Sequence, residues 1–420
     1  MNISSKKNNA QHYIDLEEKY GAHNYHPLPV VLEKGQGVYV WDVEGNRYFD
    51  FLSAYSAVNQ GHCHPRIINA LKTQAEQLTL TSRAFYNNKL GELESFLCQL
   101  FGYDKTLMMN SGVEAVETAM KLCRKWGYQI KGLPENSAKI VFAKDNFHGR
   151  TLSVISASND VTATHNFGPF IEGILQVPYN DIEALEHLFQ SEPHIAGFIV
   201  EPIQGEAGII LPAEDYLQKV RALCTQYRVL FIADEIQTGI GRTGSMLASY
   251  DILDPQSRSK PDVIILGKAL SAGVLPVSAV LANDEVMMTI HPGEHGSTYG
   301  GNPLACAVAL EAVQTVIDED LANHARKMGA LFRDGLNSIA SRYPLITHVR
   351  GKGLLNAIVI DADENDDTAW NICLSFKENG LLAKPTHGNK IRLAPPLVIS
   401  ELEIAESLRI IEQSLRKFTA

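Results

Sequence analysis

The central part of the chain alternates short apolar runs with longer segments in which apolar residues recur at helical spacing. The helical patterns cover residues 112–130 and 213–227. The apolar runs are rich in β-branched residues and cover residues 106–110, 139–143, 173–179, 196–203, 229–236, 262–267 and 276–282. Short buried strands that alternate with amphipathic helices are typical of a mostly parallel sheet with helices on both faces. This pattern therefore predicts an α/β fold built on one large, mostly parallel sheet.

The two ends of the chain have a different pattern. Residues 37–52 alternate apolar and polar side chains around a Glu-Gly-Asn turn, which predicts a β-hairpin. Residues 348–360 and 389–399 predict strands that lie between helical segments. A chain of 420 residues is long enough for two or three domains. We therefore predict a large α/β domain over residues 56–315, and a smaller α+β domain to which residues 1–55 and 316–420 both contribute.

Charge and cysteine content exclude several classes of protein. The net charge of −11 argues against binding to nucleic acids or to anionic membranes, which attract basic surfaces. The six cysteines form no Cys-x-x-Cys pair, which indicates reduced thiols in a cytosolic protein. No secretory signal opens the chain, and no apolar run approaches the about 18 residues of a membrane span. We expect a cytoplasmic protein whose ligands are small molecules.

Polar residues follow several of the predicted strands at the point where each strand ends. Asn110–Val113 follow the first strand, and Phe147–Arg150 follow the second. Glu201, Asp234 and Lys268 end or follow three more strands. Ligands of open parallel sheets bind outside the carboxyl ends of the strands. These side chains are therefore predicted to lie along one edge of one sheet.

Lys268 is the one charged residue in a long apolar run, residues 263–282. Lysine is almost never fully buried without a partner, and burial lowers the pKa of its ammonium group. A neutral amine in such a place is a nucleophile and a base. The alternative is a lysine at a strand end that extends its ammonium group into water. Lys268 by itself does not distinguish the two.

Two further features sharpen the prediction for Lys268. Ser111 and Gly112 stand at a strand-to-helix turn, where free backbone N–H groups suit a phosphate, although an ordinary helix cap is the simpler explanation for that turn alone. Asp234 is a carboxylate at a strand end, where it can cap a loop, bind a metal or pair with a ring nitrogen. An amine, a carboxylate and a phosphate site together are what pyridoxal 5′-phosphate requires.

Two other motifs have weaker interpretations. His62 and His64 flank Cys63, but this spacing suits opposite faces of an extended segment better than one tetrahedral metal site, so we expect a structural turn and no bound metal. The glycines at 239, 241 and 244 resemble a nucleotide-binding loop. They follow an acidic strand end and do not open a βαβ unit directly, so a dinucleotide-dependent oxidoreductase is a remote alternative.

Several longer motifs resemble those of the class III aminotransferases, which are pyridoxal-phosphate enzymes of fold type I. The resemblance covers nearly the whole chain. It is strongest in the segments IADEIQTGIGRTG (232–244), LGKALSAG (266–273), EHGSTYGGNP (294–303) and VRGKGLL (349–355). VEPIQGEAG (200–208) and NYHPLP (24–29) are most similar to the members of the family that act on ornithine.

The resemblance implies roles for the residues of a cofactor site. Lys268 would bind pyridoxal phosphate covalently and later move the proton, and Asp234 would pair with the pyridine nitrogen. The remaining contacts would include the helix start, a stacked ring and a neighbour of the ring hydroxyl; these residues are Ser111, Gly112, Val113, Phe147 and Gln237. Ser297 and Thr298 would reach the phosphate from a second subunit, which implies at least a homodimer.

The resemblance also implies how substrates are recognised. Arg150 and Arg392 would bind the two carboxylates of a 2-oxoacid or of glutamate, since a guanidinium group meets a carboxylate with two parallel hydrogen bonds. Glu206 would neutralise Arg392 while ornithine is bound, and Tyr25 and Tyr55 would hold the α-groups of ornithine. His148 stands where some ornithine enzymes have tryptophan.

The implied reaction moves the δ-amino group of L-ornithine to a 2-oxoacid, expected to be 2-oxoglutarate. The products would be glutamate and glutamate 5-semialdehyde, which cyclises to pyrroline-5-carboxylate and so links arginine degradation to proline biosynthesis. Two alternatives stay open at this point. One is an acetylornithine or 4-aminobutyrate aminotransferase of the same class. The other is a non-catalytic protein that holds the cofactor only as a ligand.

Overall fold

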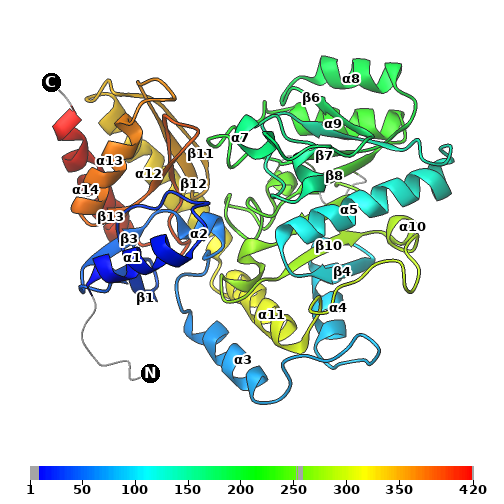
Figure 1. Cartoon of the computed structure of the whole chain (residues 1–420), viewed down its shortest axis with the longest axis horizontal. Coiled ribbons are helices and arrows are strands. Elements are labelled where there is room, and N and C mark those ends of the chain that lie inside the picture. The colour runs from blue at the N-terminus through cyan, green and yellow to red at the C-terminus, as the bar shows by residue number, and fades with distance from the viewer. Residues whose placement is uncertain (1–8, 252, 254–258, 419–420) are drawn as a thin grey trace.

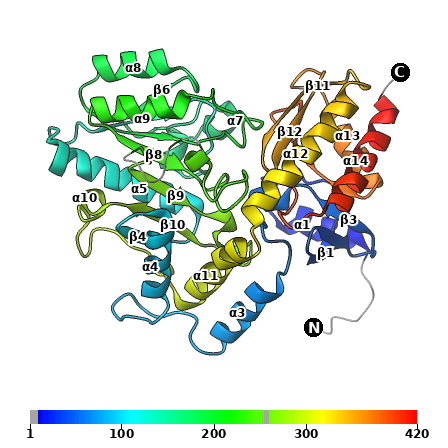
Figure 2. The same ribbon diagram turned by 180° about the vertical axis from the view of Figure 1, so that it is seen from behind.

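The computed structural model describes residues 9–251, 253 and 259–418, and these form two lobes (Figures 1 and 2). The larger lobe contains the central part of the chain, and the smaller lobe contains both ends of it. Figure 2 shows the two lobes from behind, joined by the helix α11 (Pro303–Asp318) and its continuation α12 (Leu321–Ala340). The architecture is therefore the predicted α/β fold with a second, smaller unit.

The large lobe is built on a sheet of seven strands. Their order is β4 (Lys105–Met109), β10 (Ser278–Ala282), β9 (Val263–Leu266), β8 (Leu230–Asp234), β7 (Ile195–Val200), β5 (Lys139–Ala143) and β6 (Ile174–Val177). The five strands from β9 to β6 are parallel, whereas β10 is antiparallel to both β9 and β4. The sheet is mostly parallel, as the alternation of strands and helices predicted.

Helices cover both faces of this sheet, and alternate residues of each strand face opposite sides. In β8, Phe231 and Ala233 belong to one apolar cluster, whereas Leu230 and Ile232 belong to the cluster on the other face. α9 (Tyr216–Gln226) contributes to the first cluster, and α5 (Gly112–Trp126) contributes to the second. Because side chains alternate along a strand, Asp234 points to the side of the sheet that α5 covers.

Two helices differ from their predicted bounds. The predicted helix 112–130 is α-helical only to Trp126, and a π-helical turn, η1 (Gly127–Lys131), continues it until Gly132 ends it in the left-handed region. α9 begins at Tyr216, three residues after the predicted start. Periodicity predicts that a helix exists much better than it predicts where the helix ends.

The smaller lobe combines strands from both ends of the chain in two sheets. One sheet has the order β1 (Leu32–Gln36), β2 (Tyr39–Asp42), β3 (Arg47–Asp50) and β13 (Leu381–Leu382). β2 and β3 form the predicted hairpin, and β13 joins β3 in a parallel pair. The other sheet has the order β11 (Ile346–Lys352), β12 (Leu355–Ile360), β15 (Lys390–Leu393) and β14 (Lys384–Thr386). The boundaries at residues 55 and 315 stay a prediction.

The remaining helices surround these sheets. α14 (Glu401–Leu415) packs against both α12 and α13 (Thr368–Glu378) in the smaller lobe, where α1 (Ala10–Tyr20) lies at the surface (Figure 1). The others described are α2 (Ser53–Ser56), α3 (Pro65–Ala75), α4 (Leu90–Phe101), α6 (Leu152–Ile155), α7 (Val161–Thr164), α8 (Ile182–Ser191), η2 (Ala248–Asp251), η3 (Lys268–Ser271), α10 (Asp284–Met287) and η4 (Arg416–Phe418). None of the described helices is long and apolar enough to span a bilayer.

Arg242 connects the two lobes. Its side chain is fully buried and donates hydrogen bonds to the carbonyl oxygens of Leu354 (3.0 Å) and Pro395 (2.6 Å), as well as to Oδ1 of Asn59. Burial lowers the pKa of Arg242 to about 9, which still leaves the guanidinium group charged at neutral pH. A buried charge therefore links the loop after β8 to main-chain atoms that flank β12 and β15.

Candidate active site

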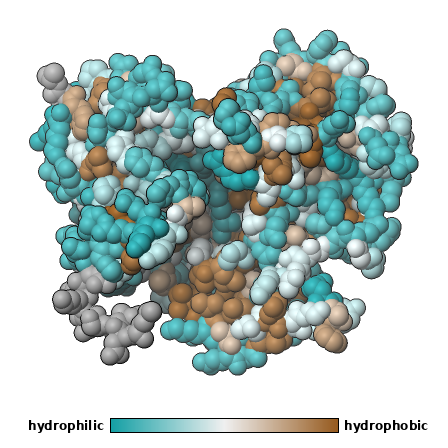
Figure 3. Space-filling model, viewed as in Figure 1, coloured by the Kyte–Doolittle hydropathy of each residue, from teal (hydrophilic) through white to brown (hydrophobic). Residues whose placement is uncertain are grey.

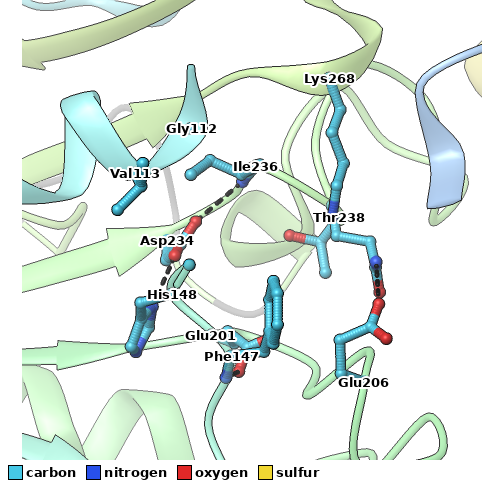
Figure 4. Close-up of a pocket in the computed structure, with 12 residues that line it drawn as sticks. Gly112, Val113, Phe147, His148, Glu201, Glu206, Asp234, Ile236, Thr238 and Lys268 are labelled. Atoms are coloured by element: carbon cyan, nitrogen blue, oxygen red, sulfur yellow. Dashed lines mark hydrogen bonds and ion pairs between the residues drawn. The ribbon is translucent and has the colours of Figure 1, made fainter. Parts of the chain in front are cut away.

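The carboxyl ends of the central strands open into a cavity of about 220 Å³ (Figure 4). Gly112 and Val113 begin α5 after β4, Asp234 ends β8, and Lys268 follows β9. Most of the residues predicted for one edge of the sheet do meet there, but Asn110, Ser111 and Arg150 do not line this cavity. The complete lining is Gly112, Val113, Phe147, His148, Gly149, Glu201, Glu206, Asp234, Ile236, Gln237, Thr238 and Lys268.

Asp234 has a buried histidine as its partner. Oδ2 of Asp234 lies 2.6 Å from Nδ1 of His148, and Oδ1 accepts a hydrogen bond of 3.0 Å from the backbone N–H of Ile236. Burial alone would lower the pKa of His148, but the hydrogen bond and the charge of Asp234 outweigh burial, so that the pKa is raised. This contact was not predicted, because nothing in the spacing of two residues 86 positions apart indicates it.

Glu201 is a second buried carboxyl group on the same side of the cavity. It accepts hydrogen bonds from the backbone N–H groups of Phe147 (3.1 Å) and Gly205 (3.3 Å). Burial raises the pKa of Glu201 to about 7, with the charge of His148 acting in the opposite direction. The cavity therefore contains a carboxyl group that titrates near neutral pH.

Lys268 lies at the other side of the cavity, in a strained backbone conformation. Its φ is +44°, in the left-handed region that costs a residue with a side chain about 1–2 kcal/mol. Burial lowers the pKa of its amine, and Arg392 adds to this, whereas Glu206 opposes it. Strain of this kind persists only where the surrounding structure imposes it, and it is concentrated at functional sites.

The start of α5 lies at the wall of the cavity. Ser111 and Glu114 cap the helix reciprocally: Ser111 Oγ accepts a hydrogen bond from the backbone N–H of Glu114 (3.4 Å), and Glu114 Oε2 accepts one from the backbone N–H of Ser111 (2.6 Å). The hydroxyl group is thus used by the helix, while Gly112 and Val113 line the cavity. A Cβ atom at Gly112 would lie 3.1 Å from Ile236, so only glycine fits here without displacing that side chain.

A salt bridge closes the side of the cavity that faces the smaller lobe. Nη1 of Arg392 lies 2.6 Å from Oε1 of Glu206, and Nε2 of Gln237 donates to the same carboxylate at 2.9 Å. Burial acts to raise the pKa of Glu206, but the charges of Arg392 and Lys268 prevail and lower it to about 2. The Arg392 guanidinium group also lies 4.8 Å from the centre of the Tyr55 ring.

A second cavity, of about 600 Å³, adjoins the first and is open to the surface between the lobes, where Figure 3 shows the molecule hollowed. Phe147, His148, Gly149 and Glu206 line both cavities. The predicted substrate-binding residues gather in the second one; these are Tyr25, Tyr55, Arg150, Glu206 and Arg392. The Arg150 guanidinium group lies 5.2 Å from the centre of the Phe147 ring.

Tyr55 is held by a turn with four consecutive residues in the left-handed region. The φ angles of Ser53, Ala54, Tyr55 and Ser56 are +48°, +47°, +61° and +69°. The turn is tied to the smaller lobe, because Ser53 Oγ donates to the carbonyl oxygen of Ala394 at 2.7 Å. No sequence signal indicates this conformation, since the turn contains neither glycine nor asparagine.

Ser297 and Thr298 are not brought to the cavity by their own chain. Ser297 Oγ accepts a hydrogen bond from Nδ2 of Asn110 at 2.8 Å, and Thr298 is exposed. Neither residue lines the two cavities. Their predicted contact with the phosphate of a neighbouring subunit stays a prediction.

The histidine motif near residue 62 has structural partners. His62 Nε2 lies 2.7 Å from Asp50, and His64 Nε2 lies 3.1 Å from Glu319. Cys63 between them is exposed. Within the described parts of the chain, no three or more His, Cys, Asp or Glu side chains gather as a metal ion would require.

Comparison with known proteins gives consistent results. A family model described as "Aminotransferase class-III" matches residues 20–415. The chain is 59% identical to "Ornithine aminotransferase, mitochondrial" of Rattus norvegicus over 97% of this chain and 91% of that one. Among solved structures, acetylornithine aminotransferase from Elizabethkingia anophelis has a TM-score of 0.89 and 55% identity, with 98% and 100% of the two chains covered. Ornithine aminotransferase from Toxoplasma gondii, whose structure is described as having partial occupancy of pyridoxal phosphate at the active site, has a TM-score of 0.92 and 46% identity, with 96% and 94% covered.

Proposed function

The chain belongs to the class III aminotransferase family, and on that premise we propose that it is an ornithine aminotransferase that transfers the δ-amino group of L-ornithine to 2-oxoglutarate. The premise makes it a pyridoxal-phosphate-dependent enzyme. The choice of ornithine rests on the salt bridge between Glu206 and Arg392, together with the identity to ornithine aminotransferases. The residue roles given below belong to the proposal.

The residues of the inner cavity fit pyridoxal phosphate. Gly112 and Val113 at the start of a helix of 15 residues would hold the phosphate, and Asp234 would pair with the ring nitrogen. Gln237 Oε1 is buried without a hydrogen-bond partner among the described residues, and it lines the cavity where the ring hydroxyl would need an acceptor. When bound, this cofactor supplies an aldehyde that accepts an amino group and a protonated ring that withdraws electrons from the neighbouring carbon.

Lys268 and Asp234 would do the chemical work that falls to the chain. The lowered pKa of Lys268 favours the neutral amine, which can take the proton from the δ-carbon of ornithine and return it later in the reaction. Asp234, held by its contact of 2.6 Å with Nδ1 of His148, would pair with the ring nitrogen and keep it protonated. Phe147 would pack against the face of the ring.

The salt bridge in the outer part of the site supports ornithine as the amino donor. Because Glu206 neutralises Arg392, an α-carboxylate has little reason to bind there, so an amino acid that binds in this state would present a different amine to the cofactor position beside Lys268. Tyr25, Tyr55 and Arg150 line the space that the α-amino and α-carboxyl groups of ornithine would then occupy. When Glu206 turns away, Arg392 and Arg150 would hold the two carboxylates of 2-oxoglutarate, and the reaction would run in reverse to give glutamate.

The other product would be glutamate 5-semialdehyde, in which an amine and an aldehyde are spaced for a five-membered ring. Its spontaneous closure to pyrroline-5-carboxylate would place the enzyme between arginine degradation and proline biosynthesis. The direction of flux is set by the concentrations of these metabolites.

An absorption spectrum of the purified protein tests the proposal directly. L-ornithine, added without a 2-oxoacid, should bleach the visible band of the bound cofactor, and 2-oxoglutarate should restore it. The Lys268→Ala variant is the matched control and should hold the cofactor without this bleaching. A wild-type band that only glutamate bleaches would contradict the ornithine assignment, and no band after addition of pyridoxal phosphate would contradict the cofactor site.

An acetylornithine or 4-aminobutyrate aminotransferase is the alternative, and the name of the Elizabethkingia anophelis structure favours the first of these. The half-reaction rates with ornithine, N-acetylornithine and 4-aminobutyrate distinguish them. Ornithine should be preferred, because the phenol groups of Tyr25 and Tyr55 suit a free amino group. A preference of tenfold or more for the acetylated substrate would favour the alternative.

The active protein is expected to be a homodimer. None of the residues of α1 is buried, and the loop after α3 exposes Leu78, Phe85 and Tyr86. Figure 3 also shows an apolar area below the hollow, where Figure 1 places α11. A second copy would cover such a surface and bring Ser297 and Thr298 to its neighbour's phosphate position.

Complementation between two defective chains tests the shared site. Lys268→Ala and Thr298→Ala chains should together regain one complete site in a mixed dimer, and sedimentation should give twice the mass of the chain. No gain of activity on mixing would contradict the shared site. The cytoplasmic location also stays a prediction, which cell fractionation would check.

A further inference from the structure

Tyr25 lies in a segment without regular structure, residues 21–29, which we call the entry segment. Most of the entry segment is exposed, yet Tyr25 lines the outer cavity together with Tyr55 and Arg392. Tyr25 itself is 73% exposed, so little of its side chain is held by packing. A feature outside the segment must therefore fix where Tyr25 stands.

The residue next to Tyr25, His26, is held from two sides by the smaller lobe. Its ring stacks on the ring of Trp370 in α13, with 4.4 Å between the centres and 11° between the planes. Its carbonyl oxygen accepts a hydrogen bond of 2.9 Å from Nζ of Lys384 in β14. These two contacts fix both the side chain and the main chain of the residue that follows Tyr25.

Lys384 lies at an electrostatically unfavourable position, because its nearest cross-strand neighbour is another cation. Lys384 and Arg392 are directly opposite in the antiparallel pair of β14 and β15, so their side chains leave the sheet on the same face. Both line the outer cavity. Burial lowers the pKa of Lys384, and the positive charge of Arg392 lowers it further. The two cations repel each other. The hydrogen bond from Lys384 to the His26 carbonyl oxygen is the contact that offsets this repulsion.

We propose that Lys384 and Trp370 are positioning residues that hold the entry segment so that Tyr25 stays over the outer cavity and sets the affinity for ornithine. This inference rests on the proposed function, because it takes Tyr25 as a contact of the amino acid end of ornithine. Glutamate, held by Arg392 and Arg150, does not need Tyr25. The two anchors should therefore affect one half-reaction and spare the other.

Rapid-mixing spectroscopy of the two half-reactions tests the inference in the holoenzyme. Lys384→Met and Trp370→Leu should each raise the apparent dissociation constant for ornithine about tenfold. The limiting rate, and both constants for glutamate, should change less than about twofold. Lys384→Arg should restore ornithine binding, because a guanidinium group can still donate to the His26 carbonyl oxygen. Lys417→Met, which removes an exposed lysine paired with Glu378 in the same lobe, is the control and should change nothing.

Two further measurements separate positioning from other roles. Amide hydrogen exchange of residues 21–29 should become faster in Lys384→Met and in Trp370→Leu, while exchange in β8 stays as in the wild type. Tyr25→Phe should raise the dissociation constant for ornithine much less in either variant than in the wild type, because a displaced Tyr25 no longer contacts ornithine.

Equal losses for ornithine and glutamate would overturn the inference, because Lys384 would then act as a general cation for carboxylates. Unchanged exchange in the entry segment would overturn it as well. Failure of the proposed function has a different signature: the wild-type enzyme itself would not react with ornithine.

Discussion

Two carboxyl groups that stand five positions apart in the sequence have opposite environments. Glu201, at the end of β7, is buried against His148 and Asp234, and its pKa is raised to about 7. Glu206 is also buried, but burial is outweighed there by Arg392 and Lys268, so its pKa falls to about 2. The first belongs to the edge of the large sheet, and the second belongs to the substrate side, which the smaller lobe and the N-terminal segments complete.

The difference separates two tasks. At the sheet edge, regular strands hold Asp234, Glu201 and Lys268 in a fixed frame, and the charges there tune one another. On the substrate side, the charged groups are paired through a salt bridge that can open, and the tyrosines lie on irregular segments. Changes at the edge should therefore affect every substrate, whereas changes on the substrate side should affect one substrate more than another.

Removal of the amine at the sheet edge should have the largest effect. Lys268→Ala should lower kcat by roughly 10⁴-fold with both ornithine and glutamate, because the general base of both half-reactions is lost. Single-turnover spectra with each amino acid measure this. A loss confined to ornithine would contradict the assignment of Lys268 to the common chemistry.

The raised pKa of Glu201 predicts a dependence of stability on pH. Because its folded-state pKa of about 7 lies above the unfolded value of 4.5, the folded protein binds more protons between these values. Its contribution is therefore complete below pH 4.5 and is lost as the pH rises through 7. Relative to Glu201→Gln, the wild type should lose about 3 kcal/mol of unfolding free energy between pH 4.5 and 8.

Denaturant unfolding of both proteins at a series of pH values measures this difference. His148 and Glu201 influence each other's pKa, so the difference between the two proteins measures Glu201 together with its coupling to His148. A difference that does not vary with pH would mean that Glu201 is not buried as an ionisable group.

Opening the salt bridge should change specificity on the substrate side. Glu206→Ala leaves Arg392 free, so the ornithine half-reaction should fall while the glutamate half-reaction holds or rises. Their ratio should shift by roughly 30-fold, near the lower end of the cost of breaking a buried charge pair. Stopped-flow traces with each amino acid give the ratio. The ratio for Glu206→Gln, which keeps a hydrogen-bond acceptor, should lie between those of the wild type and Glu206→Ala. Equal losses for both substrates would contradict the gate.

The left-handed turn that carries Tyr55 should give the smallest effect. Ala54 is exposed and has a φ of +47°, so Ala54→Gly should relieve strain and raise the unfolding free energy by about 0.5–1 kcal/mol. Ala330→Gly is the control at an exposed position within α12, where glycine should cost about 1 kcal/mol. Thermal midpoints of the two variants should therefore move in opposite directions, and equal falls would mean that the turn stores no strain.

The sequence predicted the sheet edge well because the edge follows from regular rules. Short apolar runs became strands, and polar residues at their ends met along one edge. The direction of β10 could not be predicted, since nothing in residues 276–282 tells whether a strand runs with or against its neighbours. The contact between His148 and Asp234 also escaped, because it depends on how a loop folds back over the sheet.

The substrate side was predicted only through resemblance to a family. The residues Ser53–Ser56 contain no glycine that would announce a left-handed turn, and tertiary contacts, such as that of Ser53 with Ala394, impose it. Lys384 and Trp370 gave no signal either. In the sequence, a lysine in a short strand and a tryptophan in a helix are typical surface residues. Their contacts with His26 are evident only in the folded structure.

The buried Arg242 has a mechanical consequence. A swing of the smaller lobe away from the sheet would pull the carbonyl oxygens of Leu354 and Pro395 away from its guanidinium group. The buried guanidinium group would then keep Asn59 as an acceptor but lose two hydrogen bonds, at a cost of about 1.5–3 kcal/mol each. The lobes should therefore turn as one rigid body at room temperature. Adaptation between two substrates of opposite charge then falls to rotations of single side chains, which take nanoseconds, and not to hinge opening, which takes microseconds or longer.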